Sequence, residues 1–479
     1  MSIPQRLSPP IEELRQFYVG KDINDVPKPA AILDVAIARR HCQSMLDATR
    51  ALGVGFRAHV KTHKTTQLAL LQAGGTSSTT SSTSEPAHFI ASTLPEIQHL
   101  VPALHSLRAA GRHPVTILYG IPLPPSHVPR LAALARSLGP GTVAVMLDHP
   151  SQLASLALFA QLAGFPAGVY VKVDTGYHRA GLPPGGLNKG GLVERVVGME
   201  AAAAGKGEAE LWGVYAHSSL SYKDEGPGAA MDNLAGEIEG CLEALRENAG
   251  VLGKRGKEKE VVISVGASPQ VTSIENFAGR DGREVGGSEA LKEALRKVVE
   301  GMAGGLRTRL ELHAGVYSVM DVQQLSTNAR TGLGGVEEEV ALSVVAEVCS
   351  VYNDGERGQP EALVAVGALG LGREPCPFYK GWGVVGSRSY TSLDSNGHGR
   401  RLIVERISQE HAILAWEASG EDTTEGLPPI PLEVGQTVRI YPNHACITGA
   451  LYGWYLVVDS SDKLNSSKIV DVWVRASGW

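Results

Sequence analysis

The sequence predicts an α/β protein in which a (β/α)8 barrel is followed by a separate all-β domain. Short runs rich in Val, Ile and Leu recur before about residue 330, and stretches with helical spacing lie between many of them. Eight strand–helix units over about 250 residues are typical of this barrel. An open doubly wound sheet is the alternative, but the count of eight and the polar residues just after the strands favour the barrel. The candidate strands are residues 56–60, 88–91, 115–119, 143–147, 168–174, 211–217, 261–265 and 309–313.

The first helix and the first strand can be argued residue by residue. Cys42, Met45, Leu46 and Thr49 lie at positions i, i+3, i+4 and i+7, so they share one helix face, and a glycine at position 53 follows as the stop. In the run 56–60, apolar residues alternate with polar ones, as in a half-buried strand. The other seven runs are assigned by their apolar content and length.

After about residue 330 the pattern changes to strand-like runs separated by Gly, Pro and Asp turns, with few helical periods. These runs are residues 342–349, 362–366, 401–405, 437–441 and 454–458. We therefore expect three parts. Residues 1–28 form an N-terminal segment that packs on the β domain, residues 29–325 form the barrel with insertions near 74–86 and 274–292, and residues 326–479 form the β domain.

Composition narrows the class of protein. The chain has 479 residues, 43% of them hydrophobic and 20% charged, which is ordinary for a soluble globular enzyme. A net charge of −6 without a long basic run argues against nucleic-acid binding, and no apolar run reaches the ~18 residues of a membrane helix. The N-terminus lacks a signal-peptide core, and five scattered cysteines indicate free thiols. We expect a cytoplasmic protein.

Lys61 is the most informative residue. It lies in Phe56-Arg-Ala-His-Val-Lys-Thr-His-Lys64, just after the first strand, where a barrel places catalytic groups. A lysine there suits a cofactor with a carbonyl group held as a Schiff base. Lys64 is the rival candidate, and a solvated surface lysine is the ordinary alternative. For His59 and His63 on either side, packing or hydrogen bonding is favoured over metal binding.

A second motif, Asn443-His444-Ala-Cys446, lies near the other end of the chain. His444 and Cys446 are two apart, so on an extended segment both side chains point the same way. Imidazole and thiolate together suit zinc, and only two protein ligands would leave an open position for water or substrate. The alternative is a buried cysteine beside a surface histidine.

Taken together, these motifs resemble the eukaryotic D-serine dehydratase family, related to D-threonine aldolases and alanine racemases, which are fold-type III pyridoxal-phosphate enzymes. The resemblance covers nearly the whole chain. Besides the two motifs above, it rests on Val173-Asp-Thr-Gly-Tyr-His-Arg-Ala-Gly181, Val214-Tyr-Ala-His217, Ser264-Val-Gly-Ala-Ser-Pro269, Ser408-Gln-Glu-His411 and Val470-Asp-Val-Trp473. It implies a barrel of the alanine-racemase type, pyridoxal phosphate and Zn²⁺ as cofactors, and a homodimer.

The resemblance also implies roles for individual residues. Lys61 forms the Schiff base with pyridoxal phosphate and then removes the Cα proton. Arg179 points toward the phenolic oxygen of the cofactor, and a structural salt bridge to an aspartate upstream is the alternative. Tyr215 and His217 stack on or bond to the pyridine ring, with core packing as the alternative. Tyr222 is a further candidate for the site.

The phosphate site is predicted from the barrel itself. Such barrels commonly bind phosphate with the loops after strands seven and eight, where small residues let backbone N–H groups face the anion. The corresponding loops are Ser264-Val-Gly-Ala-Ser268 and His313-Ala-Gly-Val-Tyr317, and two ordinary tight turns are the alternative. The predicted phosphate-binding residues are Gly266, Ala267, Ser268, Gly315 and Val316, with Tyr317 as a hydroxyl donor.

Two segments depart from the family pattern. Residues 218–222 read Ser-Ser-Leu-Ser-Tyr where the family has Gly-His-Ser-Tyr, and residues 366–373 lack the acid of the family's Asp-Ala-Gly. The resemblance implies a dehydratase that converts D-serine into pyruvate and ammonia, with zinc activating the β-hydroxyl. The alternatives are a D-threonine aldolase, another 3-hydroxy-D-amino-acid lyase or a racemase on the same scaffold, and a non-catalytic pyridoxal-phosphate-binding protein. Related aldolases typically have an aspartate in place of Cys446, which favours dehydration.

Overall fold

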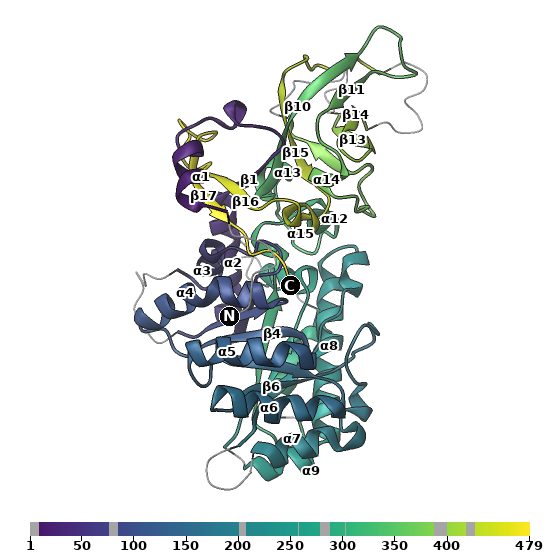
Figure 1. The fold of residues 1–479 in the computed structure, drawn as a ribbon. Coiled ribbons are helices and arrows are strands. Elements are labelled where there is room, and N and C mark those ends of the chain that lie inside the picture. Colours follow the sequence, from purple (N-terminus) through teal and green to yellow (C-terminus); the bar gives the residue numbers. More distant parts are fainter. Residues whose placement is uncertain are drawn as a thin grey trace.

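The computed structural model describes residues 9–75, 85–200, 207–256, 258–277, 288–301, 303–387, 400–417 and 427–479. They form a closed parallel barrel and a second, mainly antiparallel sheet, which lie end to end (Figure 1). The insertions predicted near 74–86 and 274–292 fall largely outside the described residues. Within the described ranges, no helix combines the length and the apolar character needed to span a membrane.

The barrel has eight parallel strands, which confirms the predicted fold class. Each of the eight predicted runs overlaps one strand, and β2 pairs with both β3 and β9 to close the ring. The strands are almost fully buried because side chains fill the inside and helices cover the outside. They are β2 (Gly55–His59), β3 (Ala87–Ala91), β4 (Val115–Pro122), β5 (Val143–Leu147), β6 (Ala167–Lys172), β7 (Ala209–Tyr215), β8 (Val261–Val265) and β9 (Thr308–Ala314).

The helices that accompany the barrel strands are α2 (Val35–Ala51), α3 (Thr66–Gln72), α4 (Leu94–Ala109), α5 (Val128–Leu138), α6 (Leu153–Ala163), α7 (Leu192–Glu200), α8 (Pro227–Glu247), α9 (Ala249–Leu252), α10 (Ser268–Thr272) and α11 (Glu289–Val299). In α2, the predicted face residues Cys42, Met45 and Thr49 are buried. Asp34 caps this helix by accepting hydrogen bonds from two backbone N–H groups, and Gly53 follows its end with φ +65°.

A buried ion pair lies inside the barrel, near the end opposite the β domain. Arg57 Nε lies 2.6 Å from Glu311 Oε1, and both side chains are buried. The other guanidinium nitrogens donate to Tyr170 Oη (3.0 Å) and Thr116 Oγ1 (3.2 Å). Because the guanidinium has these partners, it can remain charged in a site that would otherwise disfavour it.

The second sheet has the strand order β11-β14-β13-β12-β15-β10-β1-β16-β17, and β11 also pairs with β10, so six strands close on themselves. The strands are β1 (Ala30–Asp34), β10 (Leu342–Tyr352), β11 (Glu361–Val364), β12 (Gly383–Val385), β13 (Leu402–Ile407), β14 (Ala412–Trp416), β15 (Thr437–Pro442), β16 (Trp454–Val458) and β17 (Ile469–Val474). Short helices α12 (Val322–Ser326), α13 (Val336–Glu339), α14 (Ala368–Leu371) and α15 (Ala445–Ala450) lie in its connections.

The pairing of β1 differs from the barrel range predicted to begin at residue 29. β1 pairs antiparallel with β10 and parallel with β16, so it belongs to the second sheet. Helix α1 (Ile11–Tyr18) lies against β17, where Arg15 Nε donates to Asp471 (2.8 Å). Helix α1, near the start of the described residues, therefore packs on the last strand of the second sheet.

One buried apolar cluster joins the two parts. It contains Leu68 from α3 and Val316 from the loop after β9, together with Leu342 from β10, Tyr455 from β16 and Trp473 from β17. A shared core of this kind holds the ends of the barrel strands at a fixed place beneath the second sheet.

Candidate active site

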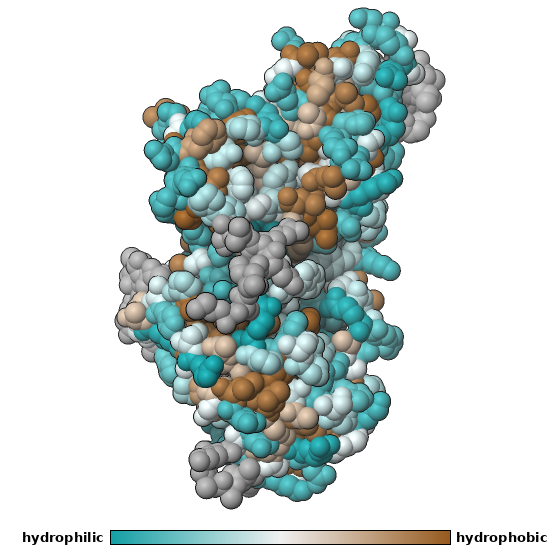
Figure 2. Space-filling model, in the orientation of Figure 1, coloured by the Kyte–Doolittle hydropathy of each residue, from teal (hydrophilic) through white to brown (hydrophobic). Residues whose placement is uncertain are grey.

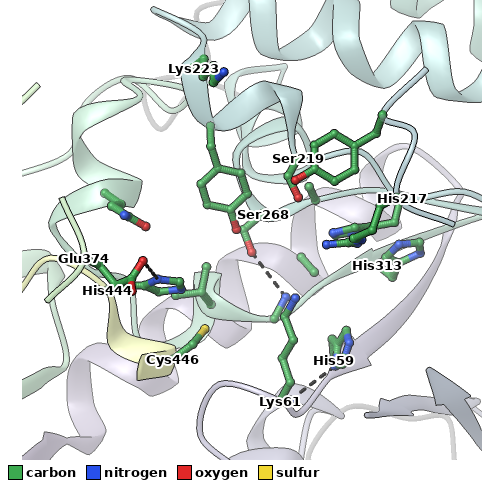
Figure 3. Close-up of a pocket in the computed structure, with 18 of the residues that line it drawn as sticks. His59, Lys61, His217, Ser219, Lys223, Ser268, His313, Glu374, His444 and Cys446 are labelled. Carbon is green, nitrogen blue, oxygen red and sulfur yellow. Dashed lines mark hydrogen bonds and ion pairs between the residues drawn. The ribbon is translucent and has the colours of Figure 1, made fainter. Parts of the chain in front are cut away.

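A cavity of about 590 Å³ lies where the barrel mouth meets the second sheet (Figure 3). Residues from both ends of the chain line it. The lining residues are His59, Lys61, Tyr177, Arg179, His217, Ser219, Tyr222, Lys223, Ala267, Ser268, His313, Ala314, Gly315, Val316, Gln323, Glu374, Pro375, Pro377, His444 and Cys446. The structure thus brings Lys61 together with both predicted metal ligands.

Lys61 lies in the turn after β2, and its side chain enters the cavity (Figure 3). Its backbone N–H donates to His59 Nδ1 (3.3 Å). The buried Arg475 holds the same turn from the second sheet by donating to the carbonyl oxygens of His63 (3.2 Å) and Thr62 (3.4 Å). The position of Lys61 is therefore fixed by both parts of the protein.

The rival lysine points elsewhere. Lys64 Nζ lies 2.8 Å from Glu96 Oε1, a buried carboxylate at the start of α4, and Lys64 does not line the cavity. His63 is buried and bonds to Thr65 Oγ1 and Gln72 Oε1, as expected for a packing residue. His59, for which packing or hydrogen bonding was also expected, accepts the hydrogen bond from the Lys61 N–H and lines the cavity as well.

Three histidines surround the barrel mouth; His59 and His313 are buried and His217 is partly buried. Burial holds the pKa of His59, His217 and His313 well below the ordinary value, and neighbouring cationic groups lower it further. They are therefore neutral near pH 7. His217 Nδ1–H donates to the carbonyl of Gly266 (2.6 Å), which leaves its Nε2 as an acceptor.

Rings from β7 and β9, the strands on either side of β8, stack at the barrel mouth. The rings of Tyr215 and His313 are parallel within 6° and their centroids are 4.3 Å apart. His313 Nδ1 bonds to Ser264 Oγ (3.1 Å), but its buried Nε2 has no hydrogen-bond partner among the described residues. An unpaired buried nitrogen at a cavity wall fits a bound group that supplies the missing partner.

The two predicted phosphate loops both reach the cavity, because Ala267, Ser268, Gly315 and Val316 line it. Ser268 Oγ also accepts from the backbone N–H of Gly315 (3.4 Å), so the two loops touch.

Two other residues predicted for the phosphate site lie off this wall. Gly266 has φ +141°, and a Cβ there would lie 2.5 Å from the carbonyl oxygen of His313, so only glycine fits. Tyr317 is buried and does not line the cavity. Tyr317 is therefore not placed to donate to a phosphate.

Arg179 lines the cavity and also a second one of about 330 Å³ on the other side of Lys61. The alternative salt bridge to Asp174 is absent, since Asp174 accepts from His178 Nδ1 (2.9 Å). Lys172, at the end of β6, lines the second cavity with its ammonium 4.7 Å from the Tyr215 ring centroid. Burial and then the charge of Arg179 lower the pKa of Lys172 to about 8. Its place at a strand end is a signal that could have identified it from sequence.

His444 directly precedes α15 and Cys446 is its second residue, so the segment turns into a helix here, whereas an extended segment was predicted. Both side chains nevertheless line the cavity. Burial opposes ionisation of Cys446, but the hydrogen bond and charge of His444 outweigh it and lower the pKa of the thiol. Burial likewise opposes protonation of His444, whereas the bond and charge of Cys446 raise its pKa to about 9. The pair thus favours a thiolate, the form in which cysteine binds soft metals.

No group of three or more His, Cys, Asp or Glu side chains forms a metal site within the described ranges. The pair His444 and Cys446 therefore stands as two candidate ligands without a third in the described part of the chain. The nearby Asp321 is engaged elsewhere, because its carboxylate accepts from the backbone N–H groups of Ala445 (2.8 Å) and Gln324 (2.9 Å).

Sequence reasoning identified part of the remaining wall. Tyr222 lines the cavity as predicted, and its hydroxyl faces Gln324. Burial raises its pKa above the ordinary value, so the hydroxyl stays protonated and can donate. The structure adds Ser219, Lys223, Gln323 and Glu374, which carry no motif that would have singled them out.

Comparison with known proteins places the whole chain in one family. Residues 34–286 match the alanine racemase N-terminal domain, and residues 341–458 match the family described as putative serine dehydratase domain. The chain is 32% identical over 472 residues to D-serine dehydratase of Schizosaccharomyces pombe, covering 98% of this chain and 96% of that one. It is 29% identical to D-serine dehydratase of Saccharomyces cerevisiae, covering 96% and 98%.

Solved structures show the same fold. D-threo-3-hydroxyaspartate dehydratase from Delftia sp. HT23 superposes with a TM-score of 0.66 at 24% identity, covering 96% of this chain and 100% of that one. D-threonine aldolase from Filomicrobium marinum gives 0.62 at 21% identity, covering 96% and 97%. Because its relatives match over nearly the full chain, both domain models match and the barrel is followed by a second sheet, the chain belongs to the eukaryotic-type D-serine dehydratase family and is a lyase.

Proposed function

We propose that this lyase is a pyridoxal-phosphate- and zinc-dependent D-serine ammonia-lyase, which converts D-serine into pyruvate and ammonia. The observation that carries the proposal is that Lys61 and the pair His444 and Cys446 line one cavity. Relatives named D-serine dehydratase, including that of Dictyostelium discoideum, match along nearly the full chain.

The residues of the cavity fit pyridoxal phosphate. Lys61 would carry it covalently, Arg179 would stabilise its phenolic oxygen, and His217 would contact the ring. Ser268, Gly315 and their neighbours would bind the phosphate. The unpaired Nε2 of His313 supports a polar group at this wall. When bound, pyridoxal phosphate supplies an electron sink for bond cleavage at Cα.

Lys61 is the proposed base for the Cα proton. Its amine is half-buried at the cavity wall, and its turn is anchored to both His59 and Arg475. A base held at one face of the substrate removes a proton from that face alone, so one enantiomer reacts. The family resemblance assigns the D-enantiomer. The hydroxyl leaves from Cβ and water later releases ammonia, so that one D-serine gives one pyruvate and one ammonia.

The pair His444 and Cys446 fits zinc by donor type, and one solved structure of D-threo-3-hydroxyaspartate dehydratase is a cysteine-to-alanine mutant in a metal-free form. Zinc would act as a Lewis acid for the departing hydroxyl, which is a poor leaving group on its own. Thr62 lies between this pair and Lys61, since its Oγ1 is 3.1 Å from Cys446 Sγ.

A homodimer in the cytoplasm completes the proposal. Leu369 on α14, Ile447 on α15 and Leu451 directly after it are exposed apolar side chains close in sequence to cavity residues. Apolar residues gather in the part of the surface where α14 and α15 lie (Figure 2). A second copy of the chain covering this face would shield both these side chains and the cavity.

The test is an assay of the purified holoenzyme with D-serine and L-serine, in which pyruvate is measured with and without a zinc chelator. We expect pyruvate from D-serine only, and none after chelation. Glycine and an aldehyde as products would instead indicate an aldolase, oxaloacetate from 3-hydroxyaspartate would indicate the related dehydratase, and L-serine as a product would indicate a racemase.

A further inference from the structure

A single carboxylate faces the cavity beside the proposed metal ligands. Glu374 Oε2 lies 4.0 Å from His444 Nδ1, and both residues line the cavity wall (Figure 3). The side chain of Glu374 is 43% exposed, and that of His444 is 28% exposed. The carboxylate thus borders the space next to the metal ligands rather than being sealed within the protein.

The backbone that carries Glu374 is fixed in place. Asn443, which precedes His444, donates from Nδ2 to the carbonyl oxygen of Glu374 (3.0 Å). Gln323 on α12 donates from Nε2 to the carbonyl oxygen of Pro375 (2.9 Å). Cys376 Sγ then donates to Ser326 Oγ, also on α12, at 3.3 Å. Hydrogen bonds thus hold three consecutive residues, which fixes the point of the backbone from which the Glu374 side chain extends.

Charge is distributed unevenly around the cavity. Lys61, Arg179 and Lys223 bring cationic groups from the barrel side. Among the described residues that line the cavity, Glu374 is the one carboxylate, and it lies on the side of the metal ligands. Lys61 and Arg179 are assigned to the cofactor, so Lys223 remains to receive the α-carboxylate of a D-amino acid. C3 and its substituents then lie toward the metal ligands, where Glu374 adds a negative charge that offsets part of the charge of the proposed zinc ion.

We propose that Glu374 determines which substituents the site accepts on C3 of the substrate. It selects 3-hydroxy-D-amino acids whose C3 bears hydrogen or a neutral group and disfavours those with a second carboxylate, such as 3-hydroxyaspartate. The inference rests on the proposed function, which directs the C3 hydroxyl toward His444 and Cys446. The second carboxylate of 3-hydroxyaspartate is bonded to that same carbon, so it cannot avoid the neighbourhood of Glu374. Like charges brought together in a partly desolvated site reduce affinity for the unwanted substrate.

Glu374→Gln tests this selection because it removes the charge and keeps the shape. The ratio of kcat/KM for D-threo-3-hydroxyaspartate to that for D-serine should rise about five- to tenfold in the holoenzyme, as expected for loss of one screened like-charge contact. Glu433→Gln is the matched control: it removes one exposed carboxylate of the same domain that lines none of the cavities described above. Its ratio should equal that of the wild type.

Binding provides a readout that does not depend on turnover. D-Aspartate and D-alanine have no hydroxyl on C3 and cannot undergo the elimination. Calorimetric titration of the holoenzyme gives the dissociation constants of both ligands. Relative to that of D-alanine, the dissociation constant of D-aspartate should fall in Glu374→Gln by about the same factor as the kcat/KM ratio rises. This measurement separates the two proposals, since it reports on Glu374 even if wild-type enzyme releases no pyruvate from D-serine.

Two results would overturn the inference. One is an unchanged ratio for both the substrate pair and the ligand pair in Glu374→Gln. The other is an equal loss of kcat/KM for both substrates and of affinity for both ligands, together with a lower zinc content. That result would mean that Glu374 acts by orienting His444, as carboxylates beside metal-binding histidines do.

Discussion

The hydroxyl of Thr62 lies 3.1 Å from the sulfur of Cys446, although the two residues are 384 positions apart in the chain. Thr62 directly follows Lys61 and is buried. The proposed cofactor lysine and the proposed metal ligand are thus joined by one hydrogen bond across the junction between barrel and second sheet.

Thr62→Val should weaken zinc binding about tenfold, because partners of metal ligands typically contribute 10- to 100-fold to metal affinity. The valine keeps the shape but cannot hydrogen-bond to the thiolate. Thr62→Ser keeps the hydroxyl and serves as the control, with wild-type affinity expected. The measurement is a competition titration against a chelator of known affinity. Equal zinc affinity for the valine and serine variants would show that this bond does not support the metal ligand.

Lys61→Ala should abolish covalent attachment of pyridoxal phosphate and all turnover. Lys64→Ala should keep both, because Lys64 is paired with Glu96 outside the cavity. Borohydride reduction followed by fragment mass spectrometry locates the modified lysine. A cofactor found on Lys64 or Lys172 would contradict the assignment.

His444→Ala and Cys446→Ala should each lower the zinc content of the purified protein, since each variant leaves only one of the two proposed protein ligands. The loss should fall on kcat more than on substrate binding, because the ion acts mainly on the departing hydroxyl. Cys349→Ala is the control, as Cys349 is an exposed thiol on the second sheet. Elemental analysis gives the zinc content. Full activity on D-serine in a zinc-free preparation would show that the reaction does not require the metal.

Glu311→Gln should destabilise the protein at neutral pH by about 3–5 kcal/mol, because it leaves the buried guanidinium of Arg57 without a counter-charge. Burial opposes ionisation of Glu311, but the charge of Arg57 lowers its pKa from 4.5 to about 2. A depressed pKa in the folded state means that this stabilisation is present above about pH 4.5 and is lost as the pH falls toward about 2.

The difference between wild type and Glu311→Gln should therefore narrow over that range, because the wild-type carboxylate then takes up a proton. Denaturant unfolding at a series of pH values measures the two free energies. A difference that stays constant with pH would mean that Glu311 is not ionised in the folded protein.

The barrel could be predicted from sequence because its strands are short apolar runs whose pattern is local. β1 could not, since Ala30–Asp34 followed by α2 has the same pattern as a barrel strand and its helix. What distinguishes it is pairing with β10 and β16, more than 300 residues away, and no local pattern carries that information.

The site divides in the same way. Lys61, His444 and Cys446 stand in motifs whose chemistry can be read from the residues, and the structure brings them to one cavity. Tyr317 was assigned to the phosphate because it ends the right loop, but the direction of its side chain depends on packing against Phe56 (ring centroids 5.5 Å apart). Glu374 could not be predicted, because its place in the cavity depends on hydrogen bonds from two distant segments.

The position of β1 has a consequence for how the protein is made. The barrel is one uninterrupted stretch, from β2 to β9, and can assemble as soon as that stretch leaves the ribosome. β1 is synthesised first but waits for β10 and β16, which are synthesised after the whole barrel. The wall with His444 and Cys446 is thus the last to form, so the barrel side of the cavity, with Lys61, can be in place before the proposed zinc ligands reach it.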